Sequence, residues 1–169
     1  ITFKASGELD NGWAVTATQV IDSSDGVANT IMDTRILAID MGDSGTLTFS
    51  GTGGSSVLAA IDDVTPTAGE ESWDDVTGAD TIPGGTGGDN MFHYSKSSLM
   101  VGITLSASYT TSDAATVVAS SSDYGVKYTG IDGLTVVIAA DENNDAAASI
   151  DITNMYVTYA MHAFSVGYQ

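Results

Sequence analysis

The sequence predicts an all-β fold, a transmembrane antiparallel up-and-down β-barrel. Short apolar bursts alternate with Gly, Ser and Thr at a spacing of two, which is the periodicity of strands with one apolar face. Tight polar turns recur roughly every 30 to 35 residues, and each interval has room for two strands of about ten residues and one longer loop. This rhythm is typical of hairpins that cross a membrane.

Composition narrows the class of protein further. The 22 acidic and four basic side chains give a formal charge of −18, which would repel a nucleic acid, so no nucleic-acid partner is expected. A hydrophobic content of 43% is too high for a disordered acidic tail. Cysteine is absent, which excludes disulfides and thiolate-bound zinc. Apolar runs are too short for a membrane-spanning helix, whereas a spanning strand needs only about 9–11 residues.

The strands follow one another along the whole chain. In the clearest one, Val101, Ile103, Leu105, Ala107 and Tyr109 alternate with Gly102, Thr104, Ser106 and Ser108. About ten strands are predicted, at the N-terminus and over residues 13–21, 30–41, 46–50, 91–94, 101–109, 124–129, 134–141, 150–161 and 164–168. Short turns are predicted at residues 10–12, 42–45, 96–98 and 132–133 and near His162.

The segment 51–90 breaks this rhythm and is predicted to be a long loop inside the barrel. A loop of this length is uncommon in a compact domain unless it has a function. It contains no Lys or Arg, and its carboxylates include Asp62, Asp63, Glu70, Glu71, Asp74, Asp75 and Asp80.

The segment from Arg35 to Phe49, RILAIDMGDSGTLTF, resembles the general porins of Gram-negative bacteria, especially the alphaproteobacterial kind. In that family an arginine-bearing strand, a Gly-Asp-aromatic-Gly turn and a Thr-Leu strand precede the pore-constricting third loop. Residues 90–95 and 102–109 resemble the next porin hairpin, and residues 124–128 and 164–168 resemble later strands. The resemblance covers nearly the whole chain.

The resemblance implies an outer-membrane barrel of about sixteen strands, of which about ten are present here, in a homotrimer. Residues 1–169 then form one barrel segment with 51–90 as the pore-constricting third loop. Because both chain ends lie in predicted strands, we expect an incomplete barrel, since an open edge in lipid leaves backbone groups unpaired.

By resemblance, the protein is a porin for passive diffusion of small hydrophilic solutes and ions, surrounded by outer-membrane lipid. The expected pore constriction sets the loop carboxylates against basic side chains of the wall: Asp62, Asp63, Glu70, Glu71, Asp74 and Asp75 against Arg35, Lys127 and Lys4. The excess of carboxylates predicts cation preference. Independently of the family, Lys127 alternates with Val126 and Tyr128, so it faces water if they face lipid.

Other interpretations use the same residues. Each loop carboxylate can also be an ordinary charge in contact with water. Arg35 can also be an ordinary ion-pair partner on the barrel wall. The metal interpretation is Ca²⁺ on Asp62, Asp63, Asp74 and Asp75, although the spacing of a known calcium loop is absent; no other cofactor is expected.

Two rival functions remain, a secreted acidic calcium-binding β-sandwich (a surface-layer or adhesin module) and a small eight-stranded outer-membrane anchor barrel. No pairing of nucleophile and base and no phosphate loop indicates an enzyme.

Overall fold

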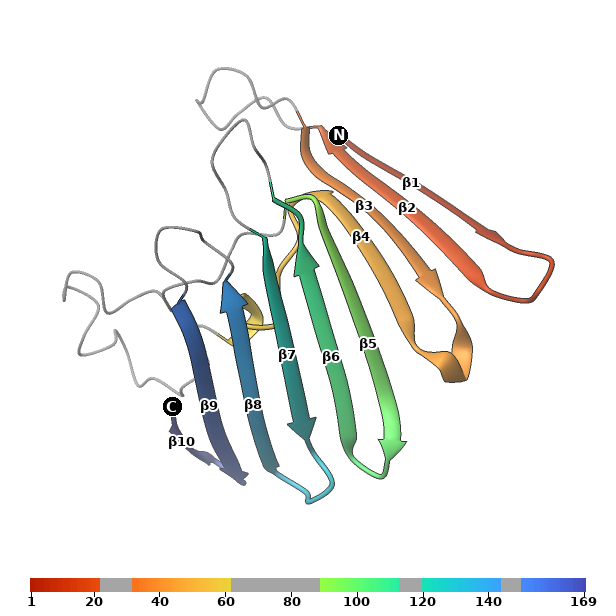
Figure 1. Cartoon of the computed structure of the whole chain (residues 1–169). Coiled ribbons are helices and arrows are strands. Elements are labelled where there is room, and N and C mark those ends of the chain that lie inside the picture. Colours follow the sequence, from red (N-terminus) through yellow and green to blue (C-terminus); the bar gives the residue numbers. More distant parts are fainter. Residues whose placement is uncertain (22–31, 62–88, 113–119, 144–149) are drawn as a thin grey trace.

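The chain forms one antiparallel sheet in which each strand pairs with the next along the sequence (Figure 1). The computed structural model describes residues 1–21, 32–61, 89–112, 120–143 and 150–169. The ten strands of these ranges are β1 (Thr2–Glu8), β2 (Ala14–Ile21), β3 (Met32–Asp40), β4 (Thr46–Thr52), β5 (Met91–Met100), β6 (Ile103–Thr110), β7 (Ser121–Tyr128), β8 (Leu134–Asn143), β9 (Ile150–Met161) and β10 (Phe164–Tyr168). The predicted all-β up-and-down topology is confirmed. In the described ranges, no helix is long and apolar enough to span a membrane.

Short turns connect β1 to β2, β3 to β4, β5 to β6, β7 to β8 and β9 to β10, all at one end of the sheet (Figure 1). Four turns occur where the sequence predicts them, and glycines with positive φ close three of them, at Gly12, Gly42 and Gly133. The turn at Gly42 is a 3₁₀ helix, η1 (Gly42–Ser44). His162 itself adopts a φ of 53° in the turn between β9 and β10. Glycine is favoured at such positions because it has no Cβ.

The turn predicted at residues 96–98 is wrong. Strand β5 continues to Met100, and Val101 and Gly102 form the turn, so Val101 lies outside the strand pattern in which it was predicted. The polar run at residues 96–98 is typical of a turn in composition, but it contains no glycine. Gly102 adopts a φ of +76°, and its carbonyl accepts a hydrogen bond of 2.7 Å from the Thr129 N–H. The positive φ therefore decides the position of the turn.

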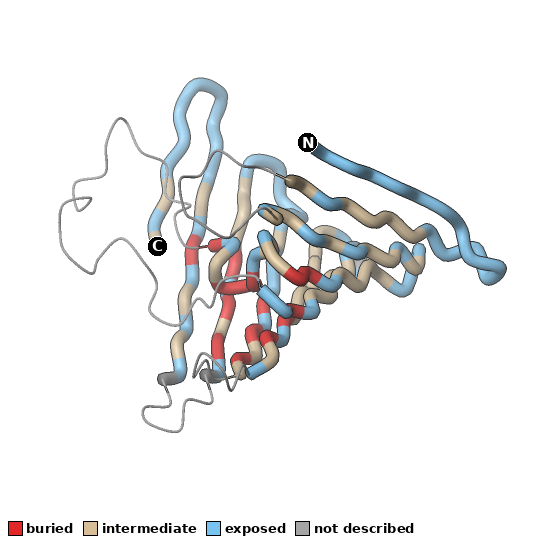
Figure 2. Tube along the Cα trace, turned by 90° about the horizontal axis from the view of Figure 1, so that it is seen from above, coloured by how far each residue is buried: buried red, intermediate tan, exposed pale blue. Residues whose placement is uncertain are grey.

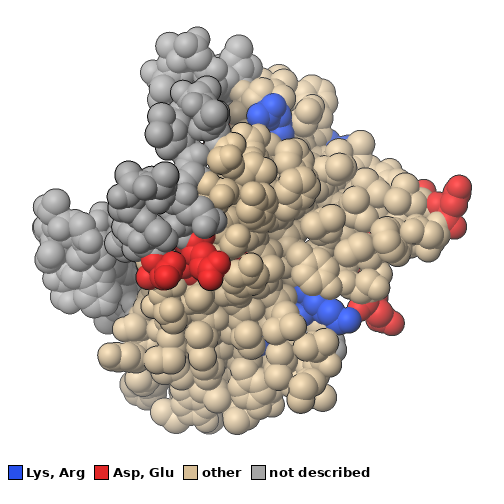
Figure 3. All heavy atoms as spheres, in the orientation of Figure 1, with Lys and Arg blue, Asp and Glu red and all other residues tan. Residues whose placement is uncertain are grey.

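The register divides the strand residues between two faces with different chemistry, because directly paired residues share a face. One row runs through Thr48, His93, Ser108, Asp123 and Asp141 on the face that we call the inner face. The neighbouring row of the other, outer face runs through Phe49, Phe92 and Tyr109, and the rings of Phe49 and Phe92 lie 5.0 Å apart. Among the described residues, uncharged side chains cover most of the surface in the view of Figure 3, and the charged groups are few and scattered. The predicted alternation of apolar and polar faces is therefore present.

Replacing Gly102 with alanine tests the turn between β5 and β6. The added Cβ would overlap the backbone of Gly130, and the alanine would have to adopt a φ of +76°. We expect Gly102→Ala to lower the free energy of unfolding by about 1–3 kcal/mol, measured by equilibrium urea unfolding.

Gly7→Ala is the matched control, because no atom lies within 4 Å of a Cβ added at Gly7. Equal stability of the two variants would contradict the role assigned to Gly102.

Candidate functional site on the inner face

After β4, the chain turns onto the inner face of the sheet and packs against strands that follow much later in the sequence. Residues 56–61, which end in the 3₁₀ helix η2 (Ala59–Ile61), contain the buried side chains of Val57, Leu58 and Ile61. These three form an apolar cluster with Val137, Ala139 and Tyr156, with Ile152 packed against it. Figure 2 shows that the buried positions gather where this segment crosses the sheet. We call residues 56–61 the seat segment.

Hydrogen bonds attach the seat segment to side chains of separate strands. The Val57 N–H donates to Ser108 Oγ of β6 at 3.0 Å, and the Leu58 N–H donates to Asp123 Oδ2 of β7 at 3.1 Å. The Ile61 carbonyl accepts from Asn154 Nδ2 of β9 at 3.2 Å and from Gln169 Nε2 at 2.8 Å. Each bond satisfies a backbone group that would otherwise be costly to bury. The attachment therefore fixes the segment at both of its ends.

The close approach of the seat segment depends on a glycine of the wall. Gly125 lies in β7 on the inner face, and a Cβ added there would lie 2.5 Å from Val57 Cγ1. This separation is far shorter than ordinary contact between carbon atoms, which is about 3.5–4.0 Å. A side chain at position 125 would therefore push Val57 away from the wall.

Two carboxyl groups lie side by side beneath the seat segment. Asp123 and Asp141 are direct cross-strand partners, and each is only 1% exposed. No hydrogen-bond partner from the described residues reaches either carboxyl oxygen of Asp141. A carboxylate without a partner is costly to bury, so this pair is an unusual feature of the inner wall.

A hollow of about 250 Å³ lies beside the seat segment on the inner face. Its lining joins Val57 and Ile61 of the segment to the wall residues His93, Ser106, Lys127 and Tyr156. It combines a cation, an imidazole and hydroxyl groups with an apolar floor. Such a surface can contact water and polar solutes.

The basic residues expected at the constriction lie on two different faces. Lys127 lines the inner hollow. Lys4 lies on the same face, because it pairs with Thr18, Thr18 pairs with Ile36, and Ile36 pairs with Ser50 of the inner face. Arg35 differs from the expectation, because its side chain lies against Gly51 on the outer face. Its Nη2 donates to the Gly51 carbonyl at 3.4 Å. The inner surface therefore includes the two lysines but not Arg35.

The expected carboxylates lie outside the described residues: Asp62, Asp63, Glu70, Glu71, Asp74 and Asp75. Their assignment to the constriction, and the calcium interpretation of the four aspartates among them, stay predictions. Within the described part of the chain, no group of three or more His, Cys, Asp or Glu side chains is placed to hold a metal ion.

Sequence reasoning missed the residues that attach the seat segment. Ser108, Asp123 and Asn154 each occupy a polar phase of an alternating strand, where a lumen-facing side chain is expected in any case. Only Asp123 has a distinguishing feature: its direct cross-strand partner, Asp141, is also acidic. Like charges directly opposite are unfavourable in an exposed sheet, so the pairing indicates a special environment.

Comparison with known proteins gives one match to a family. Residues 1–169, the whole chain, match the sequence model of the family described as Gram-negative porin. Among solved structures, a triple mutant of the porin from Rhodobacter blastica is similar, with 16% sequence identity and a TM-score of 0.49, over 98% of this chain and 71% of that one. No curated protein matches the sequence.

Gly125→Ala tests the contact that admits the seat segment. We expect the added methyl group to displace Val57 and to speed hydrogen exchange at the amides of Val57 and Leu58 by about tenfold or more, as each loses a buried acceptor worth about 1–3 kcal/mol. Hydrogen exchange followed by mass spectrometry measures the effect.

The double variant Val57→Ala/Gly125→Ala is the control, because it removes the Val57 methyl group that the new Cβ would meet. Exchange should return toward the rate of Val57→Ala alone. Exchange as slow in Gly125→Ala as in the natural protein would contradict the contact.

Proposed function

Because the chain belongs to the Gram-negative porin family, we propose that it forms a cation-preferring, water-filled pore narrowed by the segment 51–90. As a member of this family, the protein is an outer-membrane porin channel and not an enzyme. The narrowing and the ion preference are the proposed part. The attachment of the seat segment to the inner face is the observation that carries them.

The seat segment supports a constriction because of where it leads. Ile61 is buried on the inner face, and Asp62 is the next residue, with Cα atoms about 3.8 Å apart across the peptide bond. The chain therefore enters its most acidic stretch from a point that is fixed on the wall. A loop that starts inside a barrel reduces the width of the water column, and its charges act where solutes pass.

The charge distribution supports cation preference. Carboxylates exceed basic groups by 18 in the whole chain, and the segment 51–90 contains no basic residue. On our proposal, Asp62, Asp63, Glu70, Glu71, Asp74 and Asp75 face Lys127 and Lys4 of the wall across the opening. This arrangement produces a transverse field in which the negative side is larger. Small hydrophilic cations would then enter more readily than anions.

The proposed assembly is a homotrimer, with the apolar outer face against membrane lipid or a neighbouring copy. The rival functions fit the structure less well. A β-sandwich would cover the outer face with a second sheet, whereas the described residues form one sheet of ten strands. Ten strands also exceed the eight of a small anchor barrel. Calcium on Asp62, Asp63, Asp74 and Asp75 stays a separate hypothesis about the same loop.

Reversal potential in a planar bilayer tests the ion preference. With a potassium chloride gradient across the bilayer, we expect the sign that a cation-selective pore produces, because fixed carboxylates raise the local concentration of cations. An anion-selective reversal potential contradicts the proposal.

Lys127→Gln refines this test by removing a positive charge from the inner face. The cation-to-anion permeability ratio should rise, and it should rise more at low salt, where screening is weaker. The matched control is Lys96→Gln, because Lys96 pairs with Leu105 on the outer face. An equal change in both variants would show that the effect does not depend on the face of the sheet.

A further inference from the structure

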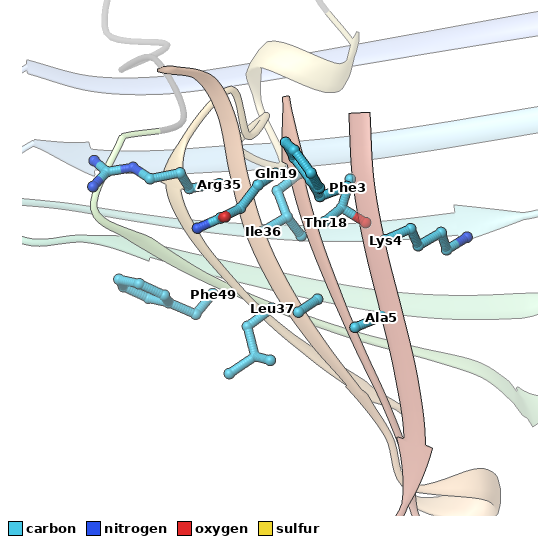
Figure 4. Close-up of a pocket in the computed structure, with 10 residues that line it drawn as sticks. Phe3, Lys4, Ala5, Thr18, Gln19, Arg35, Ile36, Leu37 and Phe49 are labelled. Atoms are coloured by element: carbon cyan, nitrogen blue, oxygen red, sulfur yellow. The ribbon is translucent and has the colours of Figure 1, made fainter. Parts of the chain in front are cut away.

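The outer face contains a hollow of about 480 Å³ across strands β1 to β4. Its apolar lining includes Phe3, Leu37 and Phe49, and Gln19 and Arg35 also contribute. In Figure 4, Arg35 and Phe49 extend to one side of the strands and Lys4 extends to the other. The hollow therefore joins an apolar surface to a single guanidinium on the face turned away from the inner hollow.

The charge of Arg35 is poorly matched by its surroundings. Its guanidinium makes one long hydrogen bond, 3.4 Å, to the Gly51 carbonyl, and no described carboxylate forms an ion pair with it. A guanidinium has five N–H donors, and its planar fork suits an oxygen anion such as phosphate. Among the described residues, no other acceptor is hydrogen-bonded to this guanidinium.

Arg35 also lies at a defined level of the outer face. Leu37 pairs with Phe49, which continues into the row of Phe92 and Tyr109. Arg35 lies two residues before Leu37 in β3, toward the end of the sheet opposite the short turns. Aromatic rows mark the boundary between hydrocarbon and headgroups in outer-membrane barrels. A cation just beyond such a row lies at the level of lipid headgroups.

We propose that this hollow binds one membrane lipid that has a phosphorylated anionic headgroup. The phosphate accepts hydrogen bonds from the Arg35 guanidinium, and Gln19 lies beside it as a further polar contact. An acyl chain lies along Phe3, Leu37 and Phe49, which removes apolar surface from contact with mobile lipid. The inference rests on the outer-membrane location of the family and not on the ion preference of the pore.

Native mass spectrometry of the full protein purified in detergent tests the site. The probes are phosphatidylglycerol, diacylglycerol with the same acyl chains, and inorganic phosphate alone. We expect the natural protein to retain phosphatidylglycerol, and Arg35→Gln to weaken retention about tenfold, since a hydrogen bond to a charged group contributes that much. Arg35→Lys should restore part of the affinity. Lys96→Gln, which removes the other outer-face cation, should leave it unchanged.

Three results would overturn the inference. Equal retention of phosphatidylglycerol by the natural protein and by Arg35→Gln would contradict the proposed contact between Arg35 and the headgroup. Retention of inorganic phosphate alone at the same concentration would indicate a free-anion site, and loss of the oligomer in Arg35→Gln without any lipid loss would indicate an interface between copies. Conductance of the natural protein is recorded on the same preparation, so a failed lipid site and a failed pore are distinguished.

Discussion

Hydrogen bonding between each strand and the next is the constraint on which the rest of the structure depends. This pairing fixes the register, and the register decides which side chains share a face. A slip of one residue in β7 would exchange Asp123 and Gly125 for Tyr124 and Val126 on the inner face. The seat segment would then lose an acceptor and the space that Val57 needs. Membrane contact and pore lining are therefore two consequences of one pairing pattern.

The sequence predicts the strands well because alternation is a local signal. The turn between β5 and β6 was misplaced because polar composition at residues 96–98 competed with the glycine that decides the geometry, Gly102. Arg35 was harder to place, since Ile36 and Ala38 on one phase of β3 are as apolar as Leu37 and Ile39 on the other. Only the pairing with β2 and β4 assigns its face, and that pairing is irregular beside Arg35.

The seat of the long segment could not be read from the sequence for a related reason. Ser108, Asp123 and Asn154 come from three strands, and nothing in the local pattern of any strand indicates that it contacts residues 57–61. The acidic character of the segment is visible in the sequence, whereas its attachment depends on hydrogen bonds between residues 51 to 108 positions apart. Distant pairing of this kind is set by topology, which composition does not encode.

The four basic side chains are divided equally between the two faces of the sheet. Lys4 and Lys127 lie on the inner face, and Arg35 and Lys96 lie on the outer face. On our proposals, the inner pair acts on solutes and Arg35 meets a lipid headgroup, so this division matters in a chain with so few basic side chains. An outer-face cation remains tolerable near a headgroup region, where its long side chain reaches water or phosphate.

The alternation of faces is tested most directly by spin labels along β6, which is practical because the chain has no native cysteine. Single cysteines at positions 103–107 and 109 would be labelled in lipid vesicles, and collision rates with oxygen and with a water-soluble nickel complex would be compared. Labels at Ile103, Leu105, Ala107 and Tyr109 should collide mainly with oxygen, and those at Thr104 and Ser106 mainly with nickel. Equal accessibility at all six positions, without a period of two, would contradict the account.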